Sequence, residues 1–512
     1  MPRQFMNKKA GDIIDGRYEI LHVFEGGMAV VYPCIDTKTE KICALKTFKI
    51  DEYLKELNID PEEFLDQYNF ETMKEALTWL KLDKHPNIVR AHAFDFLENM
   101  PYIFIELVVP DDSGKHTLRD YIFKENIHFE QLLNWAIQFC NGMEHVFESN
   151  LGPHRDITPG NILITQDKTL KITDFGLAKL WENIHFSPKF IKYGSNQTSL
   201  MQITHEGGGT PPYMAPEQFD GFTDQRSDIY SFGIVLYLTV TKGYYPLAPH
   251  TFQAGSDTLE DWEFAHKNLE IEIIDSILFN ILEKCLEKKP EDRYQSFREL
   301  KNDLEELYKK EIGKEPPKTV KGLELQAGEY NNKGYSYYKL GKKEEGIEFL
   351  KEALKKNPKL IPALNNLAGF YYLETDYKTA LEYSDQAIKI TEADPEAWNI
   401  RGGIYKDRKS SDKKYDFKEA ISFIDKAISL DPENAIYYLN KGVILRYMNK
   451  NKDACRCFKK SMNLRSNYAE AHYQLSISLK NLGRDQEAKT ERKIALRINP
   501  DYVKVEDEKN EI

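Results

Sequence analysis

The chain has 512 residues, of which 41% are hydrophobic, and its 82 acidic and 70 basic side chains give a formal net charge of −12. A chain of this length does not fold around one hydrophobic core, so at least two domains are expected. The acidic balance argues against a nucleic-acid-binding protein, which would need a basic patch, and favours protein partners.

Six cysteines are scattered through the chain without a C-x-x-C pair. This usage is typical of a reducing compartment rather than of a disulfide framework. The N-terminal residues include no apolar run that could serve as a signal peptide, and the longest apolar stretch, near residues 233–240, is far shorter than a membrane span. We therefore expect a cytoplasmic protein without a transmembrane segment.

Residues 18–49 predict a small antiparallel sheet. Apolar and β-branched residues alternate with polar ones, and turns at Glu25-Gly26-Gly27 and at residues 36–41 divide the stretch into three strands. The third strand contains I-C-A-L-K and includes Lys46. On its own the glycine turn favours a plain hairpin.

The next stretches predict a helix, a buried strand and then a larger helical region. Residues 69–82 have helical spacing and carry Glu71 and Glu75 one turn apart, whereas residues 102–108 (Y-I-F-I-E-L-V) are typical of a buried strand. From Leu118 onward the apolar spacing is helical, most clearly in residues 132–147.

Three motifs follow one another between residues 154 and 217. They read H-R-D-I-T-P-G-N-I-L, then I-T-D-F-G and, after a long polar insert, G-T-P-P-Y-M-A-P-E. Asp156 can accept a hydroxyl proton. Asn161 and Asp174 offer the hard oxygen ligands that Mg²⁺ prefers.

Because these separated motifs occur in this order, the first 310 or so residues resemble the eukaryotic-like protein kinases. The resemblance implies an α+β two-lobed fold over residues 12–312, with a small lobe over about 12–108 and a large lobe over about 109–312. It also implies ATP between the lobes, Mg²⁺ or alternatively Mn²⁺, and a protein substrate. Serine/threonine specificity is favoured because the G-T-P-P-Y-M-A-P-E segment, with Thr210, resembles that branch of the family.

The resemblance also assigns the catalytic and metal-binding roles. Asp156 becomes the base, Lys46 neutralises the α and β phosphates, and Asn161 and Asp174 hold the metal. Glu75 is expected to hold Lys46, with Glu71 as the alternative, because the Glu75 assignment leaves one extra residue before His85. The other residues expected at the nucleotide are Phe24, Gly26, Gly27, Val31, Ala44, Glu106, Val108 and Leu163, with Ile105 gating the back pocket.

Two further positions resemble structural residues of the family, and two depart from its pattern. Asp228 matches the aspartate that accepts hydrogen bonds from the catalytic-loop backbone, and Arg293 matches the arginine that pairs with Glu217. Thr158 stands where serine/threonine kinases usually have lysine, so a modest loss of rate is expected unless another cation substitutes. Phe24 replaces the first glycine of the nucleotide loop, either weakening its closure or capping it. A scaffold with a non-catalytic kinase fold is therefore the alternative function.

Residues 181–206 are predicted to form a mobile loop because they are too many for a tight turn. A phosphate in this loop would add about −1.5 to −2 charge and could pair with Arg155. A loop that is never modified is the alternative. The candidate phosphosites are Ser187, Ser195, Thr198, Ser199 and Thr204.

A second domain is predicted after a charged, proline-containing linker at residues 313–325. Small residues then recur at Ala353, Ala387, Ala427, Ser461 and Ala495, with separations of 34, 40, 34 and 34. This period is typical of tetratricopeptide helix pairs, so an all-α solenoid is expected over residues 326–502, followed by a charged tail at 503–512. Residues 409–414 account for the longer interval as a protruding loop. The five repeats are residues 327–360, 361–394, 395–434, 435–468 and 469–502.

One face of these repeats is predicted to bind a peptide partner in extended form. Asparagines can donate and accept hydrogen bonds along a peptide backbone, and a row of cations favours an acidic ligand. A solvated polar face is the alternative. The predicted groove residues are Asn331, Asn332, Asn365, Asn366, Asn399 and Asn440, with Lys406, Arg446 and Lys480 as the cations.

Overall fold

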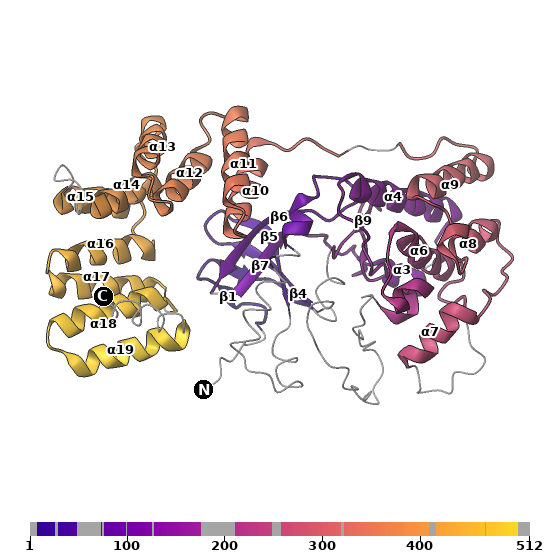
Figure 1. Cartoon of the computed structure of the whole chain (residues 1–512), viewed down its shortest axis with the longest axis horizontal. Coiled ribbons are helices and arrows are strands. Elements are labelled where there is room, and N and C mark those ends of the chain that lie inside the picture. Colours follow the sequence, from indigo (N-terminus) through magenta and orange to yellow (C-terminus); the bar gives the residue numbers. More distant parts are fainter. Residues whose placement is uncertain are drawn as a thin grey trace. The chain divides into compact units, whose positions relative to one another are not determined.

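The computed structural model describes residues 8–25, 29–48, 73, 76–98, 100–124, 127–175, 210–247, 258–318, 322–408, 416–465 and 467–499 (Figure 1). The chain divides into two compact units, each described below by itself. The first comprises most of residues 1–325, and the second comprises residues 326–512 together with the short segments Ile13–Tyr18 and Asp95–Met100. Within the ranges given above, no helix is both long and apolar enough to span a bilayer.

A mixed-length antiparallel sheet forms the N-terminal part. Its strand order is β1-β2-β4-β5-β7-β6, with β3 paired to β4 outside this path. Lys46 lies on β5 opposite Val31 of β4 and Ile103 of β7. The strands are β1 (Ile13–Ile14), β2 (Tyr18–Ile20), β3 (Phe24–Glu25), β4 (Ala29–Asp36), β5 (Lys41–Phe48), β6 (Ala91–Leu97) and β7 (Met100–Ile105).

The prediction of three strands for residues 18–49 was wrong in one respect. The first of them is divided into β2 and β3, with residues 21–23 outside the regular ladder. The Leu21 N–H still donates to the Pro33 carbonyl over 2.8 Å, so the chain stays beside β4 while its strand pairing is interrupted.

The helical part of the first unit is built around α4 and α6. Phe139 of α4 and Phe232 of α6 stack with ring centroids 4.0 Å apart, and α6 is buried over most of its length. Burial on several faces follows from its sequence, I-V-L-Y-L, which leaves no polar stripe for solvent. The elements are α3 (Leu118–Lys124), α4 (Phe129–Glu148), β8 (Ile162–Ile164), β9 (Leu170–Ile172), η1 (Pro211–Tyr213), η2 (Pro216–Asp220), α6 (Gln225–Val240), α7 (Leu259–Asn268), α8 (Phe279–Cys285), η3 (Pro290–Asp292) and α9 (Phe297–Ile312).

The second unit, orange to yellow in Figure 1, consists of helix pairs. The first helices of the pairs begin at Ala327, Ile361, Pro395, Ala435 and Ala469, every 34 residues apart from one interval of 40. The protruding loop predicted at residues 409–414 lies outside the described residues. The helices are α10 (Ala327–Lys339), α11 (Lys343–Lys356), α12 (Ile361–Leu373), α13 (Tyr377–Ile390), α14 (Pro395–Arg408), α15 (Phe417–Leu430), α16 (Ala435–Tyr447), α17 (Asn451–Leu464), α18 (Ala469–Asn481) and α19 (Asp485–Ile498).

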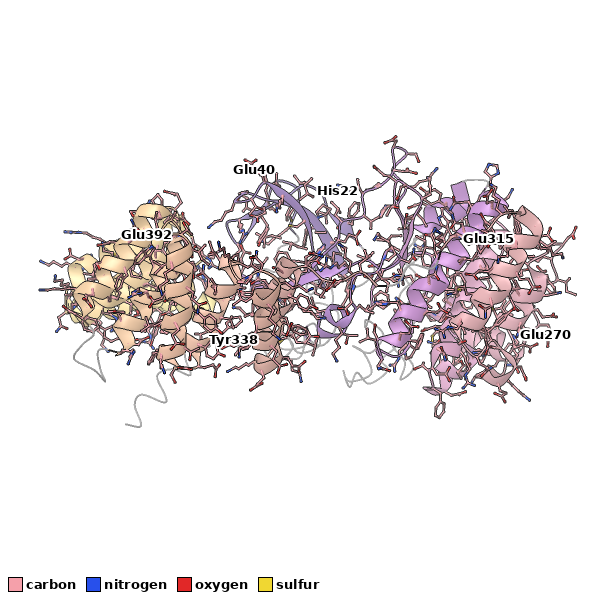
Figure 2. The ribbon with its side chains drawn as sticks, turned by 90° about the horizontal axis from the view of Figure 1, so that it is seen from above. His22, Glu40, Glu270, Glu315, Tyr338 and Glu392 are labelled. Atoms are coloured by element: carbon pink, nitrogen blue, oxygen red, sulfur yellow. The ribbon has the colours of Figure 1, made fainter. Side chains whose placement is uncertain are left out.

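Small side chains allow the two helices of a pair to approach closely. A Cβ on Gly334 of α10 would lie 2.7 Å from the Gly346 carbonyl oxygen of α11, and a Cβ on Gly442 of α16 would lie 2.5 Å from the Phe458 ring of α17. Ala353, Ala387 and Ala427, which recur with the same period, are fully buried. The side chains of these pairs, including Tyr338 on α10, are drawn in Figure 2.

Candidate active site

The loop that carries Asp156 is held by the N-terminus of α6. Asp228, in the first turn of that helix, accepts the backbone N–H of His154 over 2.7 Å and that of Arg155 over 2.8 Å. Arg155 has a φ of 71°, which L residues adopt only when surrounding contacts impose it. Burial raises the pKa of Asp228 to about 6, although His154 and the two N–H groups lower it. The predicted aspartate thus lies against the backbone of the loop that carries Asp156.

The Asp156 carboxylate is buried and has a fixed orientation. One oxygen accepts the Asn161 side-chain N–H over 2.9 Å, and the other accepts the Thr210 hydroxyl over 2.6 Å. Asn161 also donates to the Asp156 carbonyl oxygen over 2.8 Å. Three predicted site residues that are as many as 54 positions apart in sequence are therefore joined by direct hydrogen bonds.

Asn161 and Asp174 are brought together by the short hairpin of β8 and β9. Ile162 pairs with Ile172, and the Thr173 N–H donates to the Asn161 carbonyl over 3.0 Å. Among the described residues, none donates a hydrogen bond to Asn161 Oδ1 or Asp174 Oδ2. One amide oxygen and one carboxylate oxygen form a donor set that suits Mg²⁺, which keeps its other positions for water and phosphate.

Lys46 is buried and forms an ion pair with Asp174, with Nζ and Oδ1 2.8 Å apart. Its ammonium also lies 5.0 Å from the Trp79 ring centroid. The predicted partners Glu75 and Glu71 lie outside the described residues, as do Gly26 and Gly27. The sheet therefore positions the Lys46 ammonium beside the carboxylate that is suited to hold the metal.

The segment after β7 has backbone groups that suit adenine recognition. No hydrogen bond joins the Glu106 carbonyl or the Val108 N–H to another part of the chain that the structure describes. The Glu106 N–H donates to the Arg90 carbonyl over 2.8 Å, and the Glu106 carboxylate pairs with Lys171 over 2.9 Å. Nearby in the fold, Val31 and Ala44 lie on β4 and β5, Ile105 pairs with Ala44, and Leu163 lies on β8.

Phe24, which replaces a glycine of the nucleotide loop, packs between two histidines. Its ring centroid is 4.7 Å from that of His22, labelled in Figure 2, and 5.0 Å from that of His116. Burial lowers the pKa of His116, and its Nδ1 is buried without a hydrogen-bond partner in the described part of the chain. The aromatic contact links β3 to the segment before α3.

Trp79 is a site residue that was not predicted from the sequence. It is fully buried, its indole N–H donates to the Val89 carbonyl over 2.8 Å, and its ring lies 6.3 Å from that of Phe175. In the sequence Trp79 follows Glu75 by four residues, and residues four apart share one face of a helix. This spacing from a predicted site residue was the signal that could have identified Trp79.

A buried ion pair supports the segment after Thr210. Both terminal nitrogens of Arg293 donate to Glu217, over 2.7 and 2.8 Å, and Ser227 donates to the same carboxylate over 2.7 Å. The ion pair predicted from the sequence is thus bidentate.

Thr158, which departs from the lysine usual at this position, is buried, and its carbonyl accepts the Asn161 N–H over 3.1 Å.

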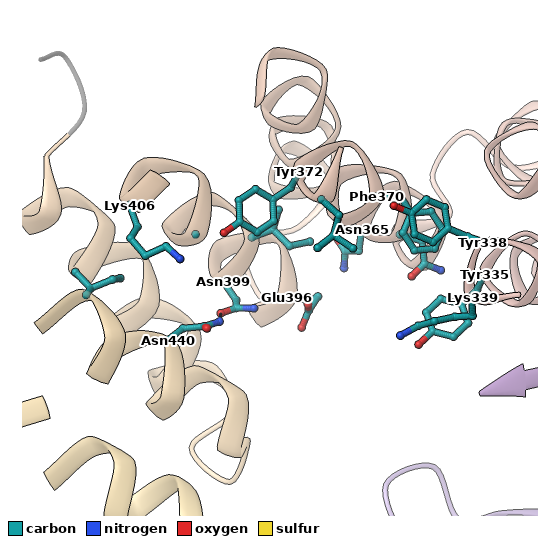
Figure 3. A pocket seen from close by; sticks show the side chains of 16 residues that line it. Tyr335, Tyr338, Lys339, Asn365, Phe370, Tyr372, Glu396, Asn399, Lys406 and Asn440 are labelled. Atoms are coloured by element: carbon teal, nitrogen blue, oxygen red, sulfur yellow. Dashed lines mark hydrogen bonds between the residues drawn. The ribbon is translucent and has the colours of Figure 1, made fainter. Parts of the chain in front are cut away.

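The second unit contains a pocket of about 570 Å³ lined by residues of α10, α12, α14 and α16 (Figure 3). Lys406, Asn399 and Asn440 lie toward one end of the pocket, and Tyr338 and Phe370 lie toward the other. Tyr372 and Asn365 lie between these two groups. Of the predicted groove residues, those that do not line it are Asn331, Asn332, Arg446 and Lys480. Those that do are Asn365, Asn366, Asn399, Lys406 and Asn440.

Several of these asparagines bind one another. Asn366 donates to Asn331 over 2.9 Å and Asn440 donates to Asn399 over 2.8 Å. In both pairs the sixth residue of one repeat lies beside the fifth residue of the preceding repeat. Asn365 donates to Asp394 over 2.7 Å and leaves its own Oδ1 buried without a partner among the described residues. An uncommitted oxygen of this kind favours a ligand that donates a hydrogen bond.

The geometry of the first unit defines a protein kinase domain. The family model for the protein kinase domain matches residues 20–360, about two thirds of the sequence, and the chain belongs to that family.

Its curated relatives include a probable serine/threonine-protein kinase of Clostridium perfringens, 33% identical over 305 residues, which cover 58% of this chain and 39% of the relative. The serine/threonine-protein kinase PrkC of Bacillus subtilis is 29% identical over 310 residues, covering 58% and 41% of the two chains. The serine/threonine-protein kinase PknB of Mycobacterium leprae is 27% identical over 322 residues, covering 60% and 45%. The chain thus spans less than half the length of these relatives.

Proposed function

We propose that the chain is an ATP- and Mg²⁺-dependent protein kinase that phosphorylates serine or threonine residues of protein substrates. The observation that carries the proposal is the hydrogen-bonded set at Asp156. Its two carboxylate oxygens accept from Asn161 and Thr210, and Asn161 is bonded through its carbonyl to Thr173, which precedes Asp174. A base, a substrate-facing threonine and two candidate metal ligands are thereby held in one cluster.

Each residue of this cluster has a distinct role in the proposed reaction. Asp156 accepts the proton of the substrate hydroxyl, and the hydrogen bonds to its oxygens fix the direction from which that hydroxyl approaches. Asn161 Oδ1 and Asp174 Oδ2 would hold Mg²⁺, which would supply charge neutralisation on the phosphates. Lys46, 2.8 Å from Asp174 Oδ1, places its ammonium where the α and β phosphates are expected. Phosphoryl transfer needs mainly such positioning and neutralisation from a protein.

Two observations support serine or threonine as the acceptor. Thr210, in the segment that resembles the serine/threonine branch, donates to Asp156 over 2.6 Å. The relatives from Clostridium perfringens and Bacillus subtilis are both named as serine/threonine-protein kinases.

The test is transfer from labelled ATP to a generic basic or acidic protein substrate, with phosphoamino-acid analysis of the product. Transfer is expected to require Mg²⁺ or Mn²⁺ and to be lost in Lys46→Met and Asp174→Ala, because both substitutions remove part of one positioning set. Phosphotyrosine as the main product would contradict the acceptor class. Transfer that persists after chelation of divalent metal would contradict the roles of Asn161 and Asp174.

A nucleotide-binding scaffold without efficient transfer is the second candidate. The observation that favours it is Thr158, which lacks the charge to neutralise a transferring phosphate oxygen. Nucleotide binding by a chain that gives no transfer above that of its catalytic variants would support this candidate.

We further propose that residues 326–502 are five tetratricopeptide repeats that recruit a protein partner. The 34-residue spacing of the helix pairs and the pocket on α10, α12, α14 and α16 support this proposal. An acidic peptide is favoured, because two cations, Lys339 and Lys406, and one carboxylate, Glu396, line the pocket together with the asparagines and aromatic rings.

Binding of acidic and basic peptide pools to the full chain at two salt concentrations tests this partner class. Lys406→Glu is expected to weaken binding of the acidic pool and to reduce its salt dependence. Lys480→Glu is a matched control, because Lys480 occupies the corresponding repeat position but does not line the pocket. Equal binding of both pools, or no effect of Lys406→Glu, would contradict the assignment.

A further inference from the structure

Residues 313–325 were predicted to be a linker. Their described parts, 313–318 and 322–325, contact the rest of the first unit at two places. Leu323 forms an isolated antiparallel bridge with Lys84, and its N–H donates to the Lys84 carbonyl over 2.6 Å. Leu325 is buried. At the other end, Lys314 pairs with Glu130 over 2.8 Å. A flexible linker would not form these contacts, because it does not pack against a folded domain.

Gly322 fits closely against α4. A Cβ at this position would lie 2.9 Å from the His145 ring and 3.6 Å from the Lys84 carbonyl oxygen. The His145 ring in turn stacks on buried His85, with centroids 4.9 Å apart and the planes 17° from parallel. Glycine is therefore the residue that lets the segment approach the His85–His145 stack and still place Leu323 beside Lys84.

The segment that receives Leu323 leads directly to the metal-binding strand. Two backbone bonds, from Val89 to Ile172 over 2.8 Å and from Ile172 to Asn87 over 2.9 Å, tie residues 84–89 to β9. Asn87 adds a side-chain bond to the Leu170 carbonyl over 3.0 Å. β9 ends two residues before Asp174.

The same segment also contacts the environment of Lys46. The Val89 carbonyl accepts the Trp79 indole N–H over 2.8 Å, and the Trp79 ring lies 5.0 Å from the Lys46 ammonium. A continuous series of contacts thus runs from Gly322 and Leu323 through residues 84–89 to both Asp174 and Lys46. This is a contiguous packed and hydrogen-bonded network, the kind of connection through which positional changes are transmitted.

We propose that residues 322–325 are a docked positioning segment of the kinase unit, which holds residues 84–89 and β9 so that Asp174 and Lys46 keep their geometry. The kinetic consequence rests on the proposed kinase function, whereas the docking itself does not. Because this segment leads into α10, any event that pulls it from Lys84 disturbs the site that binds the metal and the phosphates.

Hydrogen exchange on the full chain tests the docking without reference to activity. Gly322→Val should force the segment away from His145 and speed exchange of the Val89 and Ile172 amides by about tenfold. Gly328→Val is the matched control, because a Cβ at Gly328 meets no atom within 4 Å. Unchanged exchange at Val89 and Ile172 in Gly322→Val would overturn the proposal.

A second-site variant distinguishes docking from general misfolding. His145→Ala removes the ring that the new side chain of Gly322→Val would meet, so the double variant should recover slow exchange, whereas a misfolded chain would not. In transfer assays, Gly322→Val should raise the KM for Mg–ATP and leave the KM for the protein substrate unchanged. Equal changes in both constants, or no recovery in the double variant, would contradict a positioning role. If the wild type gives no transfer, the proposed function fails while the exchange measurement still decides the docking.

Discussion

Thr158 is an uncharged residue at a position where serine/threonine kinases usually have lysine, whose positive charge favours phosphoryl transfer. It is 7% exposed and lies two residues after Asp156. Its hydroxyl oxygen lies next to Gly160, since a Cβ on Gly160 would be 3.6 Å from Thr158 Oγ1.

Thr158→Lys is expected to raise kcat by about fivefold to tenfold, because a charge-assisted hydrogen bond is worth roughly 1 kcal/mol more than a neutral one. Steady-state transfer assays measure the change. Thr158→Met, similar in length and uncharged, is the control. An equal effect of lysine and methionine would mean that the missing charge does not limit the rate.

Asp228 gives a pH dependence with a defined sign. Burial raises its pKa from 3.8 to about 6 in the folded chain. Between these two values the folded chain keeps a proton that the unfolded chain has lost, so the free energy of unfolding falls as the pH rises through this window, by roughly 1–3 kcal/mol. The ionised form accepts the N–H groups of His154 and Arg155 without competition from its own proton, so transfer activity is expected to fall below about pH 6.

Urea unfolding at several pH values between 4 and 7 measures this contribution. In Asp228→Asn the decline of stability across the window should be smaller than in the wild type, because asparagine does not titrate. Parallel pH profiles for the two chains would show that Asp228 has an ordinary pKa.

At the scale of elements, the contact between paired helices can be tested with two glycines of the second unit. Gly442→Ala places a Cβ 2.5 Å from the Phe458 ring and should lower the free energy of unfolding by about 1–3 kcal/mol. Gly369→Ala is the control, since the nearest atom to its Cβ is Ile400 Cδ1 at 4.0 Å and alanine favours the helix by roughly 1 kcal/mol. Thermal unfolding of the full chain should show the helical unit melting earlier in the first variant only. Equal melting temperatures for Gly442→Ala and the wild type would mean that α16 and α17 can move apart without losing stability.

Elements with a strong side-chain pattern could be predicted from the sequence, and elements held by backbone contacts could not. The helix pairs repeat every 34 residues apart from one interval of 40, and α4 shows a clear apolar face, so their positions follow from spacing. The division of the first predicted strand into β2 and β3 has no side-chain signature, and one backbone bond, from Leu21 to Pro33, keeps the chain beside β4 at the interruption. The mutual pairing of Asn399 and Asn440 likewise depends on how successive repeats stack.

At the scale of the whole chain, the sequence separates into a kinase-like region and a region of repeated helices, and two compact units are present. Asp156, Asn161 and Asp174 could be identified from the sequence as candidates because the chemistry restricts each position to one or two residue types, and their catalytic and metal-binding roles stay a prediction. Trp79 and the Leu323–Lys84 bridge could not, because a buried ring and a backbone hydrogen bond are compatible with many sequences.

The central claim is that Asp156 acts as the base of a phosphoryl transfer by this chain. The most direct measurement compares wild type and Asp156→Asn for nucleotide binding and for transfer of labelled phosphate in the same preparation. Both chains are expected to bind Mg–ATP with similar affinity, because the Asp156 carboxylate is bonded to Asn161 and Thr210 and is not one of the groups proposed to hold the nucleotide, and only the wild type should transfer phosphate. Equal transfer by both chains, or binding without transfer by the wild type, would contradict the claim.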